Sequence, residues 1–368
     1  MRRIGVLTSG GDSPGMNAAV RAVVRCGIER GMEVYGIQRG YEGLIEGAFL
    51  PMSRRSVGDI LQRGGTVLKT ARCPEFETER GIKKAVSMIE TLGIDGLVCI
   101  GGGGTLKGAD ELSMRGVKVM GIPGTIDNDL GYTDFTIGFD TAVTTVLEAI
   151  GKIRDTSSSH ERTTVIEVMG RHCGDIALYA GLAGGAEEVL VPEREFDINL
   201  LSRKILLSAN VGKLHSIIIK AEGVEIESGK LVEIIQERTG RETKLVVLSY
   251  LQRGGSPTMK DRILATMCGA KAVELLAEES QSKAIGTVND EIVAYDLAEA
   301  LEQENVFNEE MYELIEVLSK MRDSAQRPAG EDCGRYRLST ISLLCAVFCN
   351  TIYIVAGTAW VQSRREDG

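Results

Sequence analysis

The sequence predicts an α/β protein with two doubly wound, Rossmann-like domains and mainly parallel sheets. Apolar runs of strand length alternate with amphipathic helical segments, and glycine-rich turns follow two of these runs. Such alternation implies parallel sheets with right-handed crossovers. The 368 residues include 44 glycines and few aromatics, which suits many tight strand-to-helix turns. A chain of this length is expected to form two domains with large cores.

The first predicted unit is a strand, a glycine loop and a helix. Residues 4–9 are mostly apolar, the loop that follows contains Gly10, Gly11 and Gly15, and residues 17–30 predict a helix. Backbone N–H groups in such a loop, together with the positive end of the helix dipole, can bind phosphate. An ordinary tight connection would give the same pattern.

The same pattern occurs at residues 95–105. Residues 95–100 predict a buried strand, and the glycine run GGGGT at 101–105 opens the next helix. This loop is a second candidate for phosphate binding at a helix N-terminus.

The stretch IPGTIDND at 122–129 is expected to carry the chemistry. It follows the apolar run 117–120, so two carboxylates and a hydroxyl come just after a predicted strand, where open α/β sheets bind ligands. Pro123 and Gly124 predict a turn. Asp127 could act as a general base toward a hydroxyl, with Thr125 as a hydrogen-bond donor. A solvated turn is the alternative for this stretch taken alone.

The second half of the chain continues the alternation. A helix is expected after residue 138, with Asp140 as its N-cap. The expected strands are 164–169, 188–191, 216–220 and 244–248, and the expected helices are one from 175, 199–210 and 230–238.

Composition excludes several classes of protein. The net charge of −10 argues against a nucleic-acid surface, so anionic substrates would be held by local arginines. The cysteines show no zinc-binding spacing, and reduced thiols in a cytoplasmic protein are expected. No signal peptide is expected before residue 4. Residues 338–361 carry no charge and are long enough to span a bilayer, although an apolar tail without a membrane role is favoured.

Several motifs occur together in a fixed order. With PGTIDND, the chain carries LTSGGDSPGMNAAVR near its start, RGGT at 63–66, DTSSSH at 155–160, EVMGR at 167–171 and LQRGGSP at 251–257. From residue 1 to about residue 315, this set resembles the ATP-dependent 6-phosphofructokinases of the bacterial type. The resemblance implies the phosphofructokinase fold. It also implies a nucleotide-binding domain at 1–138 plus 251–300, a sugar-phosphate domain at 139–250 plus 301–320, and an atypical extension at 321–368.

The resemblance implies transfer of a phosphoryl group from ATP, with Mg²⁺, to the 1-hydroxyl of fructose 6-phosphate. Asp127 would remove the proton, while Arg72, Thr125 and Arg171 would stabilise the transferring group. The implied nucleotide-binding residues are Gly11, Arg72, Cys73, Gly102, Gly103, Gly104 and Thr105. The implied sugar-phosphate residues are Thr125, Ile126, Asp127, Asp129, Arg162, Met169, Gly170, Arg171, Glu222, Lys244, Tyr250 and Arg253.

Three departures from the family pattern bear on the metal and sugar-phosphate sites. Gly103 stands where the family has an aspartate that holds magnesium, which leaves Asp129 as a candidate ligand; Lys244 replaces an arginine and Tyr250 a histidine. These departures raise a first alternative, a catalytically impaired regulatory paralogue that binds the same ligands. A second alternative is a pyrophosphate-dependent enzyme, although Gly104 and Gly124 match the ATP-using pattern.

A second, allosteric site is implied for ADP, GDP or phosphoenolpyruvate. Arg21 and Arg25 lie one helical turn apart, which by itself predicts only a solvated face. The family uses matching arginines to bind effector phosphates between subunits, so the resemblance implies a homotetramer with dihedral symmetry. The implied effector residues are Arg21, Arg25, Arg54, Arg154, Gly185, Glu187, Lys213 and His215.

Overall fold

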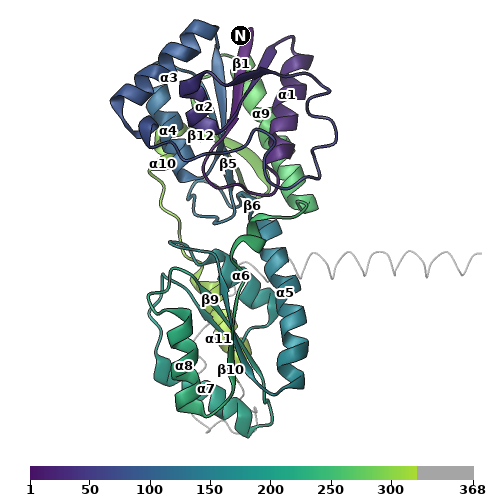
Figure 1. Ribbon diagram of the computed structural model, residues 1–368, viewed down its shortest axis with the longest axis vertical. Coiled ribbons are helices and arrows are strands. Elements are labelled where there is room, and N and C mark those ends of the chain that lie inside the picture. The colour runs from purple at the N-terminus through teal and green to yellow at the C-terminus, as the bar shows by residue number, and fades with distance from the viewer. Residues whose placement is uncertain (321–368) are drawn as a thin grey trace, which may run out of the picture. The chain divides into compact units, whose positions relative to one another are not determined.

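Two sheets organise the described chain (Figure 1). The structure, a computed structural model, describes residues 1–320; the predicted extension 321–368 and its apolar stretch 338–361 lie outside the described residues. The larger sheet has eight strands. Its order is β12 (Glu291–Asp296), β11 (Lys283–Val288), β5 (Val119–Thr125), β4 (Gly96–Gly101), β1 (Arg3–Thr8), β2 (Glu33–Ile37) and β3 (Phe49–Pro51), with β6 (Ile137–Gly138) paired to β5.

The centre of the larger sheet is parallel, and the strands at both of its edges are antiparallel. β4 is buried along its whole length, as expected for a parallel strand covered on both faces. One face packs against α1 (Met16–Glu29) and α9 (Met259–Ala277). The other packs against α2 (Gly40–Glu46), α3 (Glu79–Leu92), α4 (Gly103–Ser113) and α10 (Leu297–Leu301), and the short 3₁₀ helix η1 (Pro74–Glu77) precedes α3.

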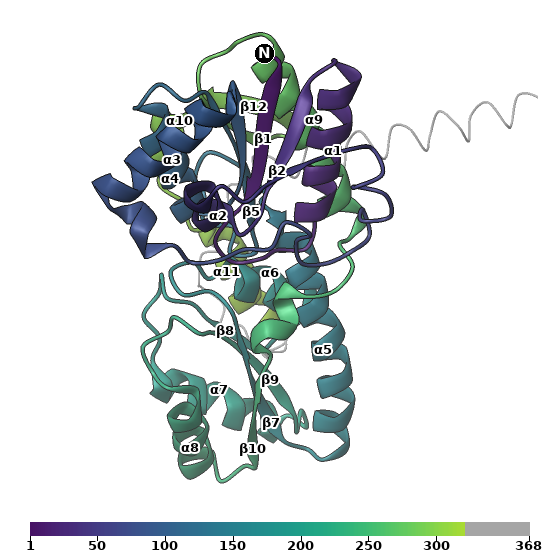
Figure 2. The ribbon, with the colours of Figure 1, turned by 45° about the horizontal axis from the view of Figure 1, so that its top comes forward.

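The smaller sheet is wholly parallel, in the order β10 (Thr243–Val247), β7 (Thr163–Val168), β9 (Ser216–Ala221) and β8 (Glu188–Leu190). Figure 2 shows α7 (Ile198–Asn210) and α8 (Ser228–Thr239) on the side of this sheet away from α5 (Phe139–Ser159). The remaining elements are α6 (Asp175–Gly184), the 3₁₀ helix η2 (Ser249–Arg253) and α11 (Glu309–Ser319). Val146 and Ile150 of α5 are buried in the core of the smaller sheet.

The predicted fold class is confirmed, and most predicted elements agree with the structure to within a few residues. The predicted turn at Pro123 and Gly124 is wrong, because both residues belong to β5. Proline is tolerated there because β11 pairs with β5 only at Met120 and Gly121, so no ladder partner needs its missing N–H. The predicted N-cap Asp140 is also wrong, because α5 begins one residue after Gly138.

The chain returns to the larger sheet through β11 and β12, and α11 then packs on α6 and β8. We propose that each sheet is the centre of one domain. The predicted boundaries at residues 138, 250 and 300 stay predictions. Among residues 1–320, no helix is long and apolar enough to cross a membrane.

Candidate active site

A cleft of about 970 Å³ opens at the carboxyl ends of β1, β4 and β5. β2 and β4 lie on opposite sides of β1, so the strand order reverses at this point. Open α/β sheets bind ligands where the order reverses, because the two adjacent loops turn away from each other and leave a crevice. Gly11, Gly102 and Asp127 bring the loops after these three strands to one cavity.

Close packing requires glycine at the base of the cleft. A Cβ on Gly101 would lie 2.3 Å from Oγ1 of Thr105 and 2.6 Å from the carbonyl oxygen of Ser9. α4 begins at Gly103 without a side-chain cap, so N–H groups of its first turn remain available to an anion in the cleft. The glycine run therefore suits phosphate binding.

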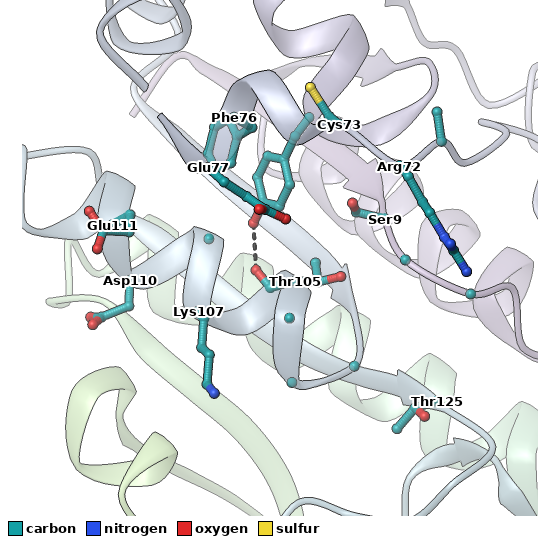
Figure 3. A pocket seen from close by; sticks show the side chains of 18 of the residues that line it. Ser9, Arg72, Cys73, Phe76, Glu77, Thr105, Lys107, Asp110, Glu111 and Thr125 are labelled. Atoms are coloured by element: carbon teal, nitrogen blue, oxygen red, sulfur yellow. Dashed lines mark hydrogen bonds between the residues drawn. The ribbon is translucent and has the colours of Figure 1, made fainter. Parts of the chain in front are cut away.

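Arginines approach the cleft from two sides. The guanidinium of Arg253 lies over Gly11, where an added Cβ would be 2.6 Å from Nη1, and it donates to the carbonyl of Asp12 at 3.2 Å. Figure 3 shows the side chain of Arg72 extending toward the end of the cleft where Thr125 lies. Thr70 donates to the carbonyl of Gly10 at 2.6 Å, which ties the Arg72 loop to the first glycine turn.

An aromatic pair forms the wall at the other end of the cleft. The rings of Tyr41 and Phe76 stack at 4.0 Å, and the Tyr41 hydroxyl donates to the carbonyl of Thr105. Gly108 leaves room for this pair, since a Cβ there would lie 2.8 Å from Tyr41. Sequence reasoning missed these three residues. The chain has few aromatic residues, so each of them was a candidate for a special role. No local pattern indicated that residues 41 and 76 contact each other.

The opposite wall of this end is polar. Figure 3 shows Lys107, Asp110 and Glu111 along α4, and Cys73 and Glu77 also line the cleft. Burial raises the pKa of the Cys73 thiol, so this side chain is a neutral contact near pH 7. This end of the cleft thus has a flat apolar surface at Tyr41 and Phe76 and charged groups along α4.

Asp127 and Asp129 line the inner end of the cleft, two and four residues after β5 ends. The Asp127 N–H donates to the Thr125 hydroxyl at 3.2 Å, which leaves that hydroxyl free to donate its own proton. Burial raises the pKa of the Asp127 carboxyl, and the charge of Asp129 raises it further; Arg253 and Arg171 act in the opposite direction. The carboxylate therefore has a pKa moved toward that of a useful general base.

Several predicted sugar-phosphate residues lie near Asp127. Arg171 and Glu222 are close enough to shift its pKa, and both follow carboxyl ends of strands in the smaller sheet. The N–H of Glu222 donates to the carbonyl of Val168 at 2.8 Å, which fixes this residue beside β7. Ile126 and Met169 are buried in the core of the smaller sheet, so their side chains are not presented to a ligand.

Three predicted sugar-phosphate residues lie away from the cleft. Arg162 and Lys244 both pair with Glu242, at 3.7 and 2.8 Å, at the amino ends of β7 and β10. Arg171 follows the carboxyl end of β7, so the strand separates it from Arg162 by about 20 Å. Tyr250 on η2 is largely exposed. Within one chain, the residues predicted to bind the sugar phosphate therefore do not all lie at one site.

Residues 3–276 match the family model described as PFK: Phosphofructokinase. The chain belongs to the phosphofructokinase family. It is 57% identical over 319 residues to the ATP-dependent 6-phosphofructokinase of Clostridium tetani, covering 87% of this chain and all of that protein. The enzyme of the same name from Alkaliphilus metalliredigens is 57% identical over 321 residues, with the same coverage.

Solved structures of phosphofructokinases share the fold. The T-state Pichia pastoris phosphofructokinase has a TM-score of 0.79 and 37% identity, over 82% of this chain but only 37% of that longer one. The pyrophosphate-dependent phosphofructokinase of Marinobacter aquaeolei has a TM-score of 0.76 and 21% identity, over 90% of this chain and 94% of that one. At that identity the likeness shows the fold alone.

The residues that the family resemblance assigns to an effector form two groups. The first group lies in the helices and connections around the smaller sheet, where Arg154 donates to the carbonyls of Gly184 and Gly185 at 2.6 and 2.8 Å and Glu187 pairs with Lys213. In the larger sheet, Arg21 and Arg25 lie on α1, and Arg54 pairs with Glu29 of the same helix. Within residues 1–320 no hydrogen bond or ion pair joins the two groups.

The donor set allows a loosely held magnesium ion. Among the described residues, no group of three or more His, Cys, Asp or Glu side chains could hold a metal ion. Magnesium needs no such cage, since it usually keeps several waters and binds one or two carboxylates together with substrate phosphates. Gly103 offers no side-chain ligand, whereas Asp129 lines the cleft. The site fits an ion held mainly by nucleotide phosphates and water, with Asp129 as a protein ligand.

Proposed function

We propose that this chain is an ATP-dependent 6-phosphofructokinase, which transfers the γ-phosphoryl group of ATP to the 1-hydroxyl of D-fructose 6-phosphate and releases ADP. The observation that carries the proposal is the position of Asp127, at the inner end of a cleft formed by two glycine turns and two arginines. The names of relatives 57% identical over their full length support the same reaction.

Asp127 is the proposed general base. It accepts the proton of the 1-hydroxyl as that oxygen attacks the γ-phosphorus, and the bond to the ADP oxygen breaks. A base needs hydrogen-bond reach to the proton and a pKa near the working pH. Burial and the neighbouring charge of Asp129 move the pKa of Asp127 in that direction.

The transferring group is stabilised by fixed positive charge and by backbone amides. Arg72 and Arg171 are the proposed side-chain donors, with the Thr125 hydroxyl and the N–H groups near Gly11 and Gly104. Guanidinium groups suit this role because they stay charged and offer several fixed donors. Removing one such donor typically costs about 10²–10³-fold in rate.

We propose that the ATP-bound magnesium ion is held by Asp129. When bound, the ion supplies neutralisation of phosphate charge. The adenosine part of ATP is proposed to lie along the Tyr41 and Phe76 wall, where flat apolar surface suits a base.

The alternative donors and roles are less well supported. Pyrophosphate would leave the Tyr41 and Phe76 end of the cleft empty, and the relatives of similar length at 57% identity are named ATP-dependent. A regulatory paralogue without activity rests on the departures at Gly103, Lys244 and Tyr250. Against it, Asp127, Arg171 and Arg253 are all present near one another. The kinase assignment is therefore preferred.

The proposal includes an assembly. We propose a cytoplasmic homotetramer in which Arg162, Lys244 and Tyr250 act in the sugar-phosphate site of a neighbouring subunit. The two groups of effector residues, one with Arg21 on α1 and the other with Glu187, would likewise come together from neighbouring subunits. They would form an effector site for ADP, GDP or phosphoenolpyruvate. The separation of these residues within one chain supports this proposal.

A coupled assay of fructose 1,6-bisphosphate formation tests the reaction. Wild type is assayed with fructose 6-phosphate and either Mg-ATP or Mg-pyrophosphate, beside Asp127→Asn. We expect turnover with ATP only, and a loss of at least about 10²-fold in the variant. Turnover with pyrophosphate alone would select the second donor, and ligand binding without turnover would select the regulatory paralogue.

A further inference from the structure

Asn128 is a buried residue between the two carboxylates that line the cleft. Asp127 and Asp129 face the cavity, whereas the Asn128 residue is only 6% exposed. Its φ is 55°, in the left-handed region that asparagine tolerates better than most other residues. The mechanism proposed above assigns no task to this side chain.

The amide of Asn128 is fully hydrogen-bonded. Its Nδ2 donates to Oδ2 of Asp175 at 2.9 Å and to the carbonyl of Asp134 at 3.4 Å, and its Oδ1 accepts from the N–H of Thr136 at 3.0 Å. The Thr136 N–H requires an acceptor and the Asp175 carboxylate requires a donor, so only one orientation of the amide satisfies both.

Asp175 lies on α6, a helix that packs against the smaller sheet. It is the first residue of α6, is 8% exposed, and follows Arg171 by four residues in the connection from β7 to α6. Burial raises the pKa of the Asp175 carboxyl, and the hydrogen bond from Asn128 acts in the opposite direction. The N–H of the preceding Gly174 donates to Glu193 at 2.7 Å, which anchors this connection a second time.

The Asn128 to Asp175 hydrogen bond therefore joins the two loops that carry opposite sides of the proposed reaction. One loop follows β5 and carries Asp127; the other follows β7 and carries Arg171. The glycine turns that line the nucleotide part of the cleft follow β1 and β4, and neither partner of this hydrogen bond belongs to them.

We propose that Asn128 and Asp175 are positioning residues that hold the Asp127 carboxylate at a fixed distance from the Arg171 guanidinium. The inference rests on the proposed function, because it assigns the base and the arginine their roles. A sugar phosphate must touch both groups at once, and a misplacement of about 1 Å in such a site can cost 10²-fold in rate.

Two substitutions can exchange the donor and the acceptor. Asn128→Asp sets a carboxylate against the carboxylate of Asp175 and loses the donor. Asp175→Asn alone keeps a weaker hydrogen bond, since its amide oxygen can accept from Asn128. The double variant restores a donor and an acceptor with reversed polarity, and the residue at 128 still accepts from Thr136.

We expect Asn128→Asp to lower kcat about 100-fold and to weaken fructose 6-phosphate binding about tenfold, with ATP affinity changed less than about threefold. The double variant should return to within about tenfold of wild-type kcat. Asn308→Asp is the matched control, because Asn308 caps α11 away from the cleft and aspartate caps equally well. Asn128→Gly keeps the left-handed backbone without the tether, and it replaces Asn128→Asp if that variant does not fold.

Calorimetric titration with fructose 6-phosphate in the absence of nucleotide is run on the same set. A wild type that binds fructose 6-phosphate without converting it would contradict the proposed function. The sugar affinities of the variants would still test whether Asn128 and Asp175 position the site. Sugar affinity and kcat that stay near wild type in both Asn128 variants overturn the inference. A double variant as defective as Asn128→Asp does so too.

Discussion

Gly103 occupies a part of the cleft with room for a side chain. A Cβ there would meet only Cδ2 of Leu130, at 3.7 Å, which is ordinary van der Waals contact. Its φ lies outside the left-handed region, so an L side chain is tolerated. The absence of a carboxylate at this position is therefore not imposed by packing.

We expect Gly103→Asp to lower the magnesium concentration for half-maximal rate by about tenfold, because one more carboxylate would face the phosphate-bound ion. Magnesium titration of the coupled assay measures this. Gly151→Asp is the matched control, since a Cβ there meets nothing within 4 Å, the added charge is the same, and residue 151 lies on α5 outside the cleft. Equal magnesium dependence in wild type and Gly103→Asp would contradict the prediction.

The charges around Asp127 predict how the rate depends on pH. A base must be ionised, so kcat/KM falls as the pH drops through its pKa. Arg253 lowers this pKa, so Arg253→Gln should move the acid limb to higher pH. Asp129 raises it, so Asp129→Asn should move the limb to lower pH. pH profiles of kcat/KM measure both shifts, and limbs that move in the same direction would show that another group titrates.

At the scale of single elements, helix α5 is capped by a residue from a distant helix. Asp261 of α9 is 1% exposed and accepts from the N–H groups of Gly138 and Thr141, both at 2.8 Å. Removing it would leave two buried N–H groups without a partner. Asp140, which the sequence suggested as the cap, lies in the first turn but accepts neither of these bonds.

Asp261→Ala should therefore lower the free energy of unfolding by about 2–4 kcal/mol. Asp140→Ala, the matched control at the same helix end, should lose less than about 1 kcal/mol, the size of a helix-dipole effect. Urea unfolding followed by circular dichroism at one protein concentration compares them. If Asp140→Ala lost more free energy of unfolding than Asp261→Ala, Asp140 would be the N-cap of α5 after all.

These elements show what the sequence could and could not predict. Strands followed by glycine turns are local patterns, so β4 and α4 were predictable to within a residue or two. The continuation of β5 through Pro123 depends on which neighbour pairs there, and the cap of α5 comes from residue 261. The stacking of Tyr41 on Phe76 is likewise a contact between separate segments. Tertiary pairing of this kind leaves no periodic signal.

At the scale of the whole molecule, the predicted sugar-phosphate residues divide between two ends of one sheet. Arg162 and Arg171 lie at opposite ends of β7, about 20 Å apart. α9 also exposes an apolar stripe of Met259, Ile263 and Met267, which are 75%, 51% and 46% exposed. Spacings of four residues place them on one face of the helix, and a contiguous apolar face is typical of an interface.

Hybrid oligomers test whether the site is shared between subunits. Asp127→Asn and Arg162→Ala chains are each expected to be nearly inactive alone. In a site shared across a two-fold interface, random mixing pairs an intact Asp127 with a neighbour's intact Arg162 in about one quarter of the sites. Chains carrying different tags are co-refolded, and hybrids purified through both tags are assayed. Recovery toward that fraction supports a shared site. Hybrids no more active than the two parents would contradict a site shared between subunits.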